Sequence, residues 1–265
     1  MNQIELINVR KDYTTKTLGT VTAVNNFNLT IKKGECFSFL GPSGCGKTTT
    51  LRMLAGFEDL SEGEIRLEGK VVSNKAKNLY VPPEHRNLGM VFQAFAVWPH
   101  LNVFDNVAFP LQVQKRPKAE IEERVNLALK QTNLLDQAKV FPSDLSGGEQ
   151  QRIALARSIV VNPGILLLDE PLSNLDPKLR ESMRFEIKRL QKEYNFTIVF
   201  VTHDQSEALA LSNRLLVMNK GEIIQIGTPQ ELYNKPVSLF VHNFLGESNF
   251  TKVVYRDGKV YAEGD

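Results

Sequence analysis

The first residues that could do chemistry form a glycine-rich segment. Residues 41–48 read GPSGCGKT and fit the spacing G-x-x-x-x-G-K-[ST], in which backbone N–H groups surround the phosphates of a nucleotide. The glycines lack the Cβ that would hold the backbone away from a ligand, and the strand-like run before them and the helix-forming run after them favour this site over an ordinary turn. Lys47 can then reach the β- and γ-phosphates, while the Thr48 hydroxyl is a ligand for Mg²⁺. We predict nucleotide contacts from Gly41, Pro42, Ser43, Gly44, Cys45, Gly46, Lys47, Thr48 and Thr49.

Two acidic residues end an aliphatic run later in the chain. Residues 165–168 read ILLL, and Asp169 and Glu170 follow them directly. An apolar strand that ends in two carboxylates can place one beside Mg²⁺ and the other beside an attacking water. We therefore assign Asp169 to the metal and Glu170 to the general base. The alternative is that both acids merely end a strand, although Pro171 prevents a simple helical continuation.

Two further polar side chains follow predicted strands. Gln93 comes after the run LGMVF, and His203 comes shortly after the run TIVFV. Open α/β sheets present ligand-contacting side chains at such strand ends. Gln93 could hold Mg²⁺ or water, and His203 could contact the γ-phosphate or polarise Glu170. Each of the two alone would more often be an ordinary solvated side chain.

A second glycine-containing segment precedes a different helix. Residues 145–152 read LSGGEQQR, and the residues after them are rich in Ala, Ile, Leu and Arg. Consecutive glycines at a helix N-terminus expose backbone N–H groups to an anion. The sequence therefore predicts two separate anion-binding elements.

These residues require strands and helices that hold them at one edge of a sheet. The N-terminal third alternates like antiparallel strands, whereas the later strands are continuous apolar runs joined by a helix, as in a parallel sheet. The predicted strands are Ile4–Val9, Val21–Ile31, Ser61–Leu67, Gly69–Val72, Leu88–Phe92, Ile165–Leu168, Thr197–Val201, Leu215–Met218 and Glu222–Ile226. A helix is predicted from Pro177 to Tyr194.

The middle of the chain has a different pattern. From about Ala94 to Asn162 we find no convincing strand, and after an aromatic stretch the pattern predicts helices over Lys118–Thr132 and within Leu145–Val161. Beyond the last strands, Thr228-Pro-Gln-Glu231 has the spacing of a capping box and opens a helix. The chain then predicts a helix over Val237–Leu245 and a hairpin over Phe250–Tyr261 that turns at Asp257-Gly258. In the helix predicted over Lys118–Thr132, the expected apolar positions are Ile121, Val125, Leu127, Ala128 and Leu129.

Composition excludes several classes of protein. The 265 residues suffice for one substantial core and a subdomain. The 32 basic and 30 acidic side chains nearly cancel, and no basic run suggests a nucleic-acid partner. Cys36 and Cys45 are too few for a disulfide framework or a zinc site, which fits a reducing compartment. No signal peptide or stretch of 18 apolar residues is present, so any membrane role must be peripheral.

Taken in order, the motifs resemble the ATP-binding cassette (ABC) family of ATPases. GPSGCGKTT, Gln93, LSGGEQQR, ILLLDEP, SNLD at 173–176 and His203 match that family's motifs, and the resemblance covers about Ile4 to Leu245. It implies an α/β fold: a P-loop NTPase core with a mixed, largely parallel sheet, an N-terminal antiparallel β portion and an inserted helical subdomain. The core would comprise residues 1–93 and 163–245, and the helical signature subdomain residues 94–162. Residues 246–265 would be the start of a C-terminal β extension. Many such proteins carry a C-terminal regulatory domain, which we expect to be either truncated or absent here.

The resemblance also implies the ligands and their places. ATP and Mg²⁺ would lie between two copies of the chain. The phosphate loop (residues 41–48) of one copy and the signature segment (LSGGEQQR, residues 145–152) of the other would hold them. Tyr13 would stack on adenine, unless it is an ordinary surface tyrosine in a loop. The nucleotide contacts implied beyond the phosphate loop are Tyr13, Ser146, Gly147, Gly148, Glu149 and Asp176. The metal ligands would be Thr48, Gln93 and Asp169, and the catalytic residues Glu170, His203 and Gln93.

Within the family, the stretches LGMVFQ, DEPLSNLDPKLR, VTHDQSEALALSNR and GTPQELYNKP resemble ATPase subunits of binding-protein-dependent importers for ferric iron, polyamines, phosphonates, sulfate and sugars. The stretch AFAVWPHLNVFDNVAFPL is more similar to the iron, polyamine and phosphonate branches. The resemblance implies a homodimer at the cytoplasmic face of the cell membrane that drives integral membrane permease subunits and, indirectly, serves a solute-binding protein. Phe95, Val97, Trp98 and Phe104 would either face the permease or pack in the core.

Two alternatives remain from other classes. One is a soluble ABC ATPase that acts on a macromolecular complex rather than in transport. The distance from Gln93 to Leu145 leaves no room for a long coiled coil, which disfavours it. The other is a P-loop kinase or GTPase, which leaves LSGGEQQR unexplained.

Overall fold

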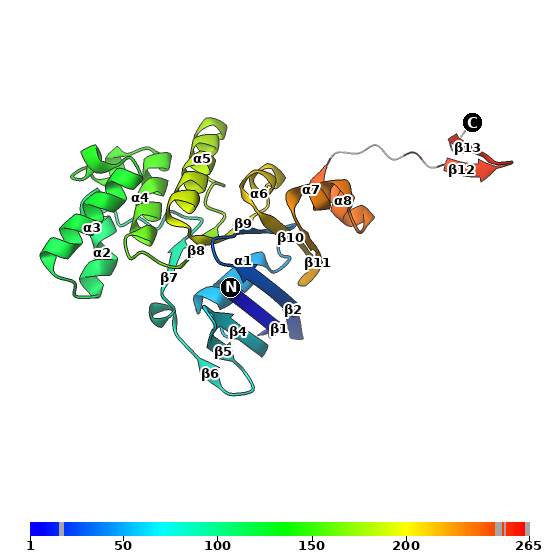
Figure 1. Cartoon of the computed structure of the whole chain (residues 1–265), viewed down its shortest axis with the longest axis horizontal. Helices are drawn as coiled ribbons and strands as arrows, with labels where there is room; N and C mark the ends of the chain where they lie inside the picture. The colour runs from blue at the N-terminus through cyan, green and yellow to red at the C-terminus, as the bar shows by residue number, and fades with distance from the viewer. Residues whose placement is uncertain (16–18, 247–250, 252, 263–265) are drawn as a thin grey trace.

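The computed structural model describes residues 1–15, 19–246, 251 and 253–262. Its N-terminal part forms a five-stranded antiparallel sheet in the order β2-β1-β4-β5-β6 (Figure 1). Short alternating strands with turns between them produce this arrangement, because one face can be buried while the other stays polar. The strands are β1 (Asn2–Thr15), β2 (Gly19–Lys32), β4 (Glu62–Leu67), β5 (Lys70–Asn74) and β6 (Leu79–Tyr80).

A six-stranded sheet has the order β11-β10-β3-β9-β8-β7, and all of its neighbouring strands run parallel except β10 and β11. Its three central strands, β3, β9 and β8, are buried along their whole length, which explains their continuous apolar sequences. Parallel strands end at one edge of the sheet, so the loops after β3, β9, β8 and β7 meet there. The strands are β3 (Cys36–Leu40), β7 (Leu88–Val91), β8 (Ile165–Asp169), β9 (Thr197–Thr202), β10 (Arg214–Asn219) and β11 (Glu222–Gly227).

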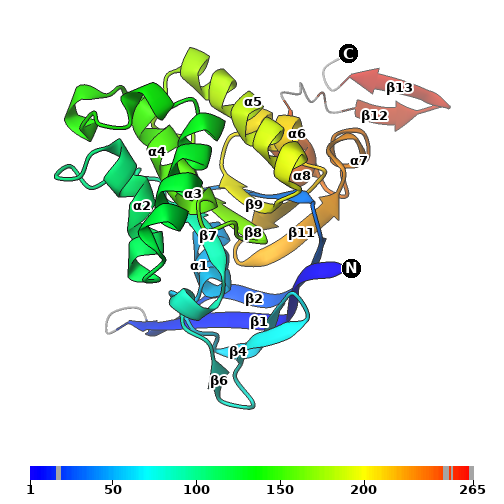
Figure 2. The same ribbon diagram turned by 60° about the vertical axis from the view of Figure 1, so that its left-hand side comes forward.

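Helix α1 (Lys47–Ala55) lies between the two sheets (Figure 2). Leu51, Met53 and Leu54 are fully buried in one hydrophobic cluster with side chains of both sheets. Gly56 ends the helix in the left-handed region with φ 83°, where glycine has no Cβ to clash. Packing on two sides thus fixes the helix whose N-terminus is the phosphate loop.

The opposite face of the six-stranded sheet is covered by helices. The segment between β7 and β8 contains helices and no strand. Its apolar side chains form one cluster with residues of β8, β9 and the following helix α5, so the helical segment shares a core with the sheet. The elements are α2 (Val103–Val113), α3 (Lys118–Gln131), α4 (Gly147–Ile159) and α5 (Pro177–Tyr194), with short 3₁₀ turns η1 (Pro83–His85), η2 (Leu135–Gln137) and η3 (Pro142–Asp144).

The helix α2 is not anticipated by the sequence pattern. Pro110 lies inside it and suggests a break, but Asn102 caps its start by accepting a hydrogen bond from the Asp105 N–H at 2.8 Å. Leu127 of α3 was expected in the core and is 54% exposed. The helix α3 therefore buries a narrower stripe than its apolar residues indicate.

The C-terminal part forms a smaller apolar cluster with one end of the large sheet. The predicted capping box is present, because the Thr228 hydroxyl accepts from the Glu231 N–H and the Glu231 carboxylate accepts from the Thr228 N–H. The hairpin also forms, although residues 250 and 252 of the predicted stretch lie outside the described residues. The elements are α6 (Gln205–Leu211), which the sequence pattern did not indicate, α7 (Pro229–Asn234), α8 (Leu239–Leu245), β12 (Val253–Arg256) and β13 (Lys259–Ala262). Across the described part of the chain, no helix has the length and apolarity that a membrane crossing requires.

Candidate functional site

Three polar side chains meet where neighbouring parallel strands end. Glu170 directly follows β8, His203 directly follows β9, and Gln93 comes shortly after β7. His203 Nδ1 lies 3.0 Å from Glu170 Oε2, and Gln93 Nε2 donates to the same oxygen at 3.4 Å. The structure thus brings together the residues that the sequence predicts as catalytic.

Glu170 has an unusual backbone conformation. Its φ is 43°, in the left-handed region that residues with a Cβ rarely adopt. Such a conformation costs on the order of 1–3 kcal/mol and is found preferentially at functional sites. The Glu170 N–H donates to the carbonyl of Val201 at 2.9 Å, which holds the strained residue against β9. Its side chain is 18% exposed and that of His203 is 59% exposed, so the carboxylate is partly shielded from water.

Two oxygen ligands lie beside this cluster. The Thr48 hydroxyl donates to Asp169 Oδ1 at 3.1 Å, and Asp169 is only 7% exposed. Burial raises the pKa of Asp169, although the Thr48 hydrogen bond acts in the opposite direction. A cation beside Asp169 would stabilise its charged form, and oxygen ligands of this kind suit Mg²⁺. Gln93, the third predicted metal ligand, directs its amide to Glu170 and Ser173.

The described residues contain no cluster of three or more His, Cys, Asp or Glu side chains that could hold a metal ion. Mg²⁺ in nucleotide sites takes one or two protein ligands and completes its shell with phosphate oxygens and water. Thr48 and Asp169 are the residues that would hold it.

The phosphate loop leads into the N-terminus of α1. Gly46 is the N-cap residue, no side chain caps the helix, and its first turn contains no acidic residue. At Gly46 φ is 107° and a Cβ would lie 2.5 Å from the carbonyl oxygen of Ala23, so only glycine fits. Lys47 is buried, and its Nζ donates to the carbonyls of Gly41 at 2.7 Å and Pro42 at 3.0 Å. A helix N-terminus with a lysine fixed at the loop is a strong site for an anion.

Both cysteines are buried and form no disulfide. Burial raises the pKa of the Cys45 thiol and that of Cys36, the latter to about 12. Cys45 Sγ lies 3.9 Å from Lys47 Nζ, within the phosphate loop. The thiols are therefore neutral and pack as small apolar groups.

The signature segment caps the start of α4. The Ser146 N–H and hydroxyl both donate to the Glu149 carboxylate, at 2.8 and 2.6 Å, and the Glu149 N–H donates back to the Ser146 hydroxyl at 3.4 Å. The hydrogen bond from the Ser146 hydroxyl is the largest of the effects that lower the pKa of Glu149. A Cβ at Gly148 would lie 2.4 Å from Leu179, so this glycine allows α4 to pack against α5. Ser146 and Gly147 are exposed, which leaves the helix N-terminus accessible.

The two elements predicted to bind anions belong to different parts of the chain. The helix α4 packs with α2 and α3, whereas α1 lies between the sheets. Within the described ranges, no hydrogen bond joins residues 146–148 to the phosphate loop. Asp176, another predicted nucleotide contact, is exposed and caps α5 by accepting from the Leu179 N–H at 3.1 Å.

Tyr13 lies within β1 rather than in a loop. It pairs with Val21 of β2, and Lys11 Nζ lies 4.9 Å from its ring centroid. Lys11 is itself fixed by Glu58 at 3.0 Å. A cation over one ring face holds the ring in place, and the adenine contact remains a prediction.

Sequence reasoning missed several polar residues that connect these loops. Asn174 Nδ2 donates to the carbonyl of Gln93 at 3.0 Å, and Ser173 Oγ donates to the carbonyl of Glu170 at 3.0 Å. Both lie in the SNLD motif. Ser173 and Glu170 are three residues apart, whereas Asn174 and Gln93 are 81 residues apart. The Asn174 contact depends on the order of the strands, which no local pattern reveals.

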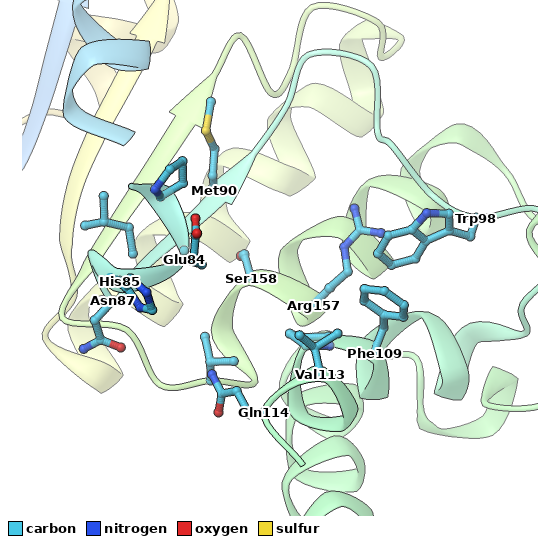
Figure 3. A pocket seen from close by; sticks show the side chains of 15 residues that line it. Glu84, His85, Asn87, Met90, Trp98, Phe109, Val113, Gln114, Arg157 and Ser158 are labelled. Carbon is cyan, nitrogen blue, oxygen red and sulfur yellow. The ribbon is translucent and has the colours of Figure 1, made fainter. Parts of the chain in front are cut away.

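A pocket of about 450 Å³ lies between β7, η1, α2 and α4 (Figure 3). Trp98 and Phe109 form part of its wall, with ring centroids 4.4 Å apart. The Arg157 guanidinium lies 4.3 Å from the Trp98 ring, and its Nη1 has no hydrogen-bond partner in the part of the chain described. Four side chains were predicted either to face a permease or to pack in the core. Of these, Trp98 lines the pocket, while Phe95, Val97 and Phe104 are partly buried and pack against the core.

The phosphate loop, the acid pair after β8 and the largely parallel sheet define a P-loop nucleotide-binding protein. A family model described as "ABC transporter" matches residues 24–173, which include the glycine-rich loop, the signature segment and both acids. The chain belongs to the ABC transporter family.

Curated relatives share about half of the residues. The spermidine/putrescine import ATP-binding protein PotA of Thermobifida fusca is 53% identical over 93% of this chain and 62% of its own length. The trehalose/maltose import ATP-binding protein MalK of Thermococcus litoralis is 48% identical over 92% of this chain and 67% of its own length. The chain thus spans about two thirds of the length of these relatives.

Solved structures are similar in fold. A dimeric structure of the ATP-binding cassette MJ0796, in a post-hydrolysis state bound to ADP and Pi, is 33% identical with a TM-score of 0.74, covering 85% of this chain and 98% of that one. The cbiO1 structure from Clostridium perfringens, part of the transporter complex cbiONQ, is 29% identical with a TM-score of 0.78, covering 89% of this chain and 92% of that one. The predicted fold class is confirmed.

Proposed function

We propose that this chain is the ATP-hydrolysing subunit of an ABC importer. The observation that carries the proposal is the contact of Glu170 with His203 and Gln93, beside the Thr48–Asp169 pair and at the sheet edge where the phosphate loop begins. A base, a metal site and a phosphate site at one edge are the parts that phosphoryl transfer to water requires. The alternative, a soluble ABC ATPase that acts on a macromolecular complex rather than in transport, is less favoured. The curated relatives named above are import proteins.

Glu170 has the role of general base in this proposal. Its carboxylate accepts the proton of the water that attacks the γ-phosphate. An ionised carboxylate only accepts hydrogen bonds, so the His203 Nδ1 that faces it is the donor of this contact. Gln93 donates to the same carboxylate oxygen and fixes its direction. Mg²⁺, when bound at Thr48 and Asp169, would neutralise charge on the phosphate oxygens.

The active form would be a homodimer with ATP at the interface. The phosphate loop and the Ser146–Gly148 segment are both accessible anion sites, yet nothing in the described chain joins them to each other. A second copy, placed head to tail, lets the signature of one copy complete the phosphate site of the other. The dimeric cassette MJ0796 supports this arrangement. Loss of the γ-phosphate charge would then separate the copies and move a partner.

The partner we propose is an integral membrane permease, which would hold the chain peripherally at the cytoplasmic face of the membrane. Phe92, Phe109 and Val113 are 38%, 39% and 65% exposed, and the latter two line the pocket beside Trp98. Exposed apolar side chains around a concavity are typical of a protein interface. Gln93 directly follows Phe92, so a partner bound here would lie next to the candidate catalytic cluster.

The solute we propose is a polyamine. The support is the similarity to proteins named for spermidine and putrescine import, six of which are between 50% and 53% identical to this chain. The sugar-import relative at 48% is the rival within the same class. Ferric iron and phosphonate, which the sequence stretch also suggested, have no support among the relatives named above. The permease and the solute-binding protein would make the selection, because no part of the proposed ATP site contacts the solute.

Mixed dimers test the shared site. One copy carries Lys47→Ala and the other Ser146→Arg, and differently tagged copies allow the mixed species to be isolated. In a head-to-tail dimer, one interface combines both lesions, and the other combines an intact phosphate loop with an intact signature. One good site survives, so the occluded ATP should be about half the wild-type amount, whereas each variant alone should occlude little.

If each chain used its own signature segment, both sites in the mixed dimer would carry a lesion. The absence of occlusion in confirmed mixed dimers would therefore contradict the shared geometry. ATP occlusion is preferred to turnover as the measurement, because hydrolysis at one site can depend on the other. Wild-type protein without any Mg²⁺-dependent ATP hydrolysis would contradict the proposed function itself.

A further inference from the structure

Arg180 connects the two loops that carry the candidate base and His203. It lies in the first turn of α5, and its Nη2 donates to the carbonyl of Leu175 at 3.2 Å. Its Nη1 lies 3.4 Å from Asp204 Oδ2, and its Nε lies 3.6 Å from Glu207 Oε1. One guanidinium therefore contacts both the loop after β8 and the loop after β9.

Glu207 is the buried end of this connection and is 2% exposed. Burial raises the pKa of Glu207, while the hydrogen bond from Thr202 acts in the opposite direction. The Thr202 hydroxyl donates to Glu207 Oε2 at 2.6 Å and accepts from the Asp204 N–H at 3.0 Å. Thr202 and Asp204 are the chain neighbours of His203. The position of His203 is thus fixed from both sides by groups that contact the Glu207 carboxylate or Arg180.

The loop after β8 is held on its other side by the Gln93 loop. Asn174 donates to the Gln93 carbonyl at 3.0 Å, and Ser173 donates to the Glu170 carbonyl at 3.0 Å. We name residues 170–180 the bridging segment. It begins at the candidate base, passes the Gln93 loop and ends at the guanidinium that contacts the His203 loop.

We propose that Arg180 is a positioning residue for hydrolysis, which acts with Glu207 to hold the bridging segment against the His203 loop and so keeps His203 in contact with Glu170. This inference depends on the proposed function. It assigns to Arg180 no contact with nucleotide, because its contacts are Leu175 and the two carboxylates. The consequence is that its loss should slow hydrolysis and leave nucleotide binding intact.

Stability alone does not account for this pair. Desolvation of the buried Glu207 carboxylate offsets much of its attraction to Arg180, and an apolar pair of similar volume is often as stable. Arg180 Nε is also buried without a hydrogen bond in the described part of the chain, which makes the pair still less favourable. A planar guanidinium with donors in fixed directions is suited to holding two loops at one relative position.

The test uses Arg180→Met, Glu207→Gln and the double variant that combines these two substitutions. Each is compared with the control Arg184→Met. Arg184 is the matched control, because it lies one turn further along α5 and contacts Ser206 of α6 at 3.5 Å, with neither Asp204 nor Glu207 as an ion-pair partner among the described residues. In Arg180→Met we expect kcat to fall by about tenfold or more, since small misplacement of reacting groups has effects of this size. ATP affinity should stay within about twofold of wild type. Arg180→Lys should recover part of the rate.

A second measurement separates positioning from folding. The protein has 4 histidines, so the ring resonance of His203 can be assigned by its loss in His203→Ala. That resonance should shift in Arg180→Met and not in Arg184→Met. Should Arg180→Met fail to fold because it leaves Glu207 unpaired, the double variant removes that charge and gives the same comparison.

The inference is overturned if the folded variants at position 180 match Arg184→Met in kcat, or if they leave the His203 resonance unchanged. It is also overturned if ATP affinity falls in proportion to the rate, because Arg180 would then act on nucleotide binding. In each case wild-type hydrolysis would still stand, so the proposed function is tested separately.

Discussion

His203 Nδ1 and Glu170 Oε2 lie 3.0 Å apart although the residues are 33 positions apart in the chain. The contact exists because β8 and β9 are parallel neighbours, with Asp169 in register with Val201. Both strands therefore end at the same level, and the residue after each strand points to a common site. Glu170 has a strained backbone with φ 43°, and its carboxylate lies at that site in contact with His203 and Gln93.

Glu170→Gln should bind ATP normally and lose hydrolysis by about 10²–10⁴-fold, because the isosteric amide keeps the shape but cannot accept the proton of water. A long-lived ATP-bound dimer should accumulate and be visible by size-exclusion chromatography with light scattering. Glu181→Gln, on the exposed side of α5, is the matched control. Turnover at the wild-type rate would remove Glu170 from the role of base, and loss of ATP binding would show a structural effect.

Asp169→Asn should stabilise the protein without nucleotide at neutral pH by about 0.5–2 kcal/mol while it abolishes Mg²⁺-dependent hydrolysis. Burial raises the pKa of Asp169 above its unfolded value, so the folded state favours the protonated form. Protonated Asp169 therefore contributes to the free energy of unfolding. This contribution is fully present below the pKa of Asp169 in the unfolded chain and is lost as pH rises through its pKa in the folded protein. At neutral pH the wild type bears the cost of the buried charge.

Urea unfolding across a pH series measures this difference. The advantage of Asp169→Asn should be present at pH 7 and disappear at acid pH, whereas Asp144→Asn, on the surface, should show no such trend. An equal or lower stability of Asp169→Asn at pH 7 would mean that the Thr48 hydrogen bond outweighs desolvation.

Arg86→Met should destabilise the fold by about 3 kcal/mol or more, because several buried acceptors lose their donor at once. Arg86 is 5% exposed, and burial lowers its pKa to about 10. It joins the end of α1 to the segment before β7. Its hydrogen bonds go to the carbonyls of Val81, Met53 and Leu54 and to the Ser73 hydroxyl, at 2.7, 2.7, 2.9 and 2.8 Å.

Chemical denaturation of Arg86→Met checks this expectation, with Arg66→Met as the control. The Arg66 side chain is 42% exposed, and its partner Glu64 also accepts a hydrogen bond from Asn74, so loss of Arg66 should change stability by less than about 1 kcal/mol. Equal effects of the two variants would show that the Arg86 carbonyl contacts contribute little.

Tyr13→Ala should weaken ATP binding by a few-fold and Tyr13→Phe should not, because a stacked ring contributes about 0.5–1.5 kcal/mol and the hydroxyl is not needed. Lys11→Met should have a smaller effect of the same sign, since Lys11 lies over the ring and holds it. Titration with a fluorescent ATP analogue measures both. Unchanged affinity in Tyr13→Ala would identify Tyr13 as an ordinary surface residue of β1.

Local sequence determined the elements whose signals lie within a few residues. The helix α5 spans the predicted Pro177–Tyr194 because Asp176 caps it, Pro177 starts it and Asn195 ends it in the left-handed region. The Thr228–Glu231 capping box and the glycine-rich loop were recognisable for the same reason. The helix α2 escaped detection because Pro110 contradicts its pattern locally while tertiary packing keeps it intact.

Tertiary structure alone decided which of the predicted residues meet and which unnoticed ones support them. Strand order places Gln93, Glu170 and His203 together, and it also assembles Arg180 with Asp204 and Glu207. Motif spacing predicts turns, caps and phosphate loops, because their hydrogen bonds join residues that are only a few positions apart. Contacts between loops depend instead on the order and register of buried parallel strands. Packing of the whole core sets that register, so no single residue or short segment predicts it.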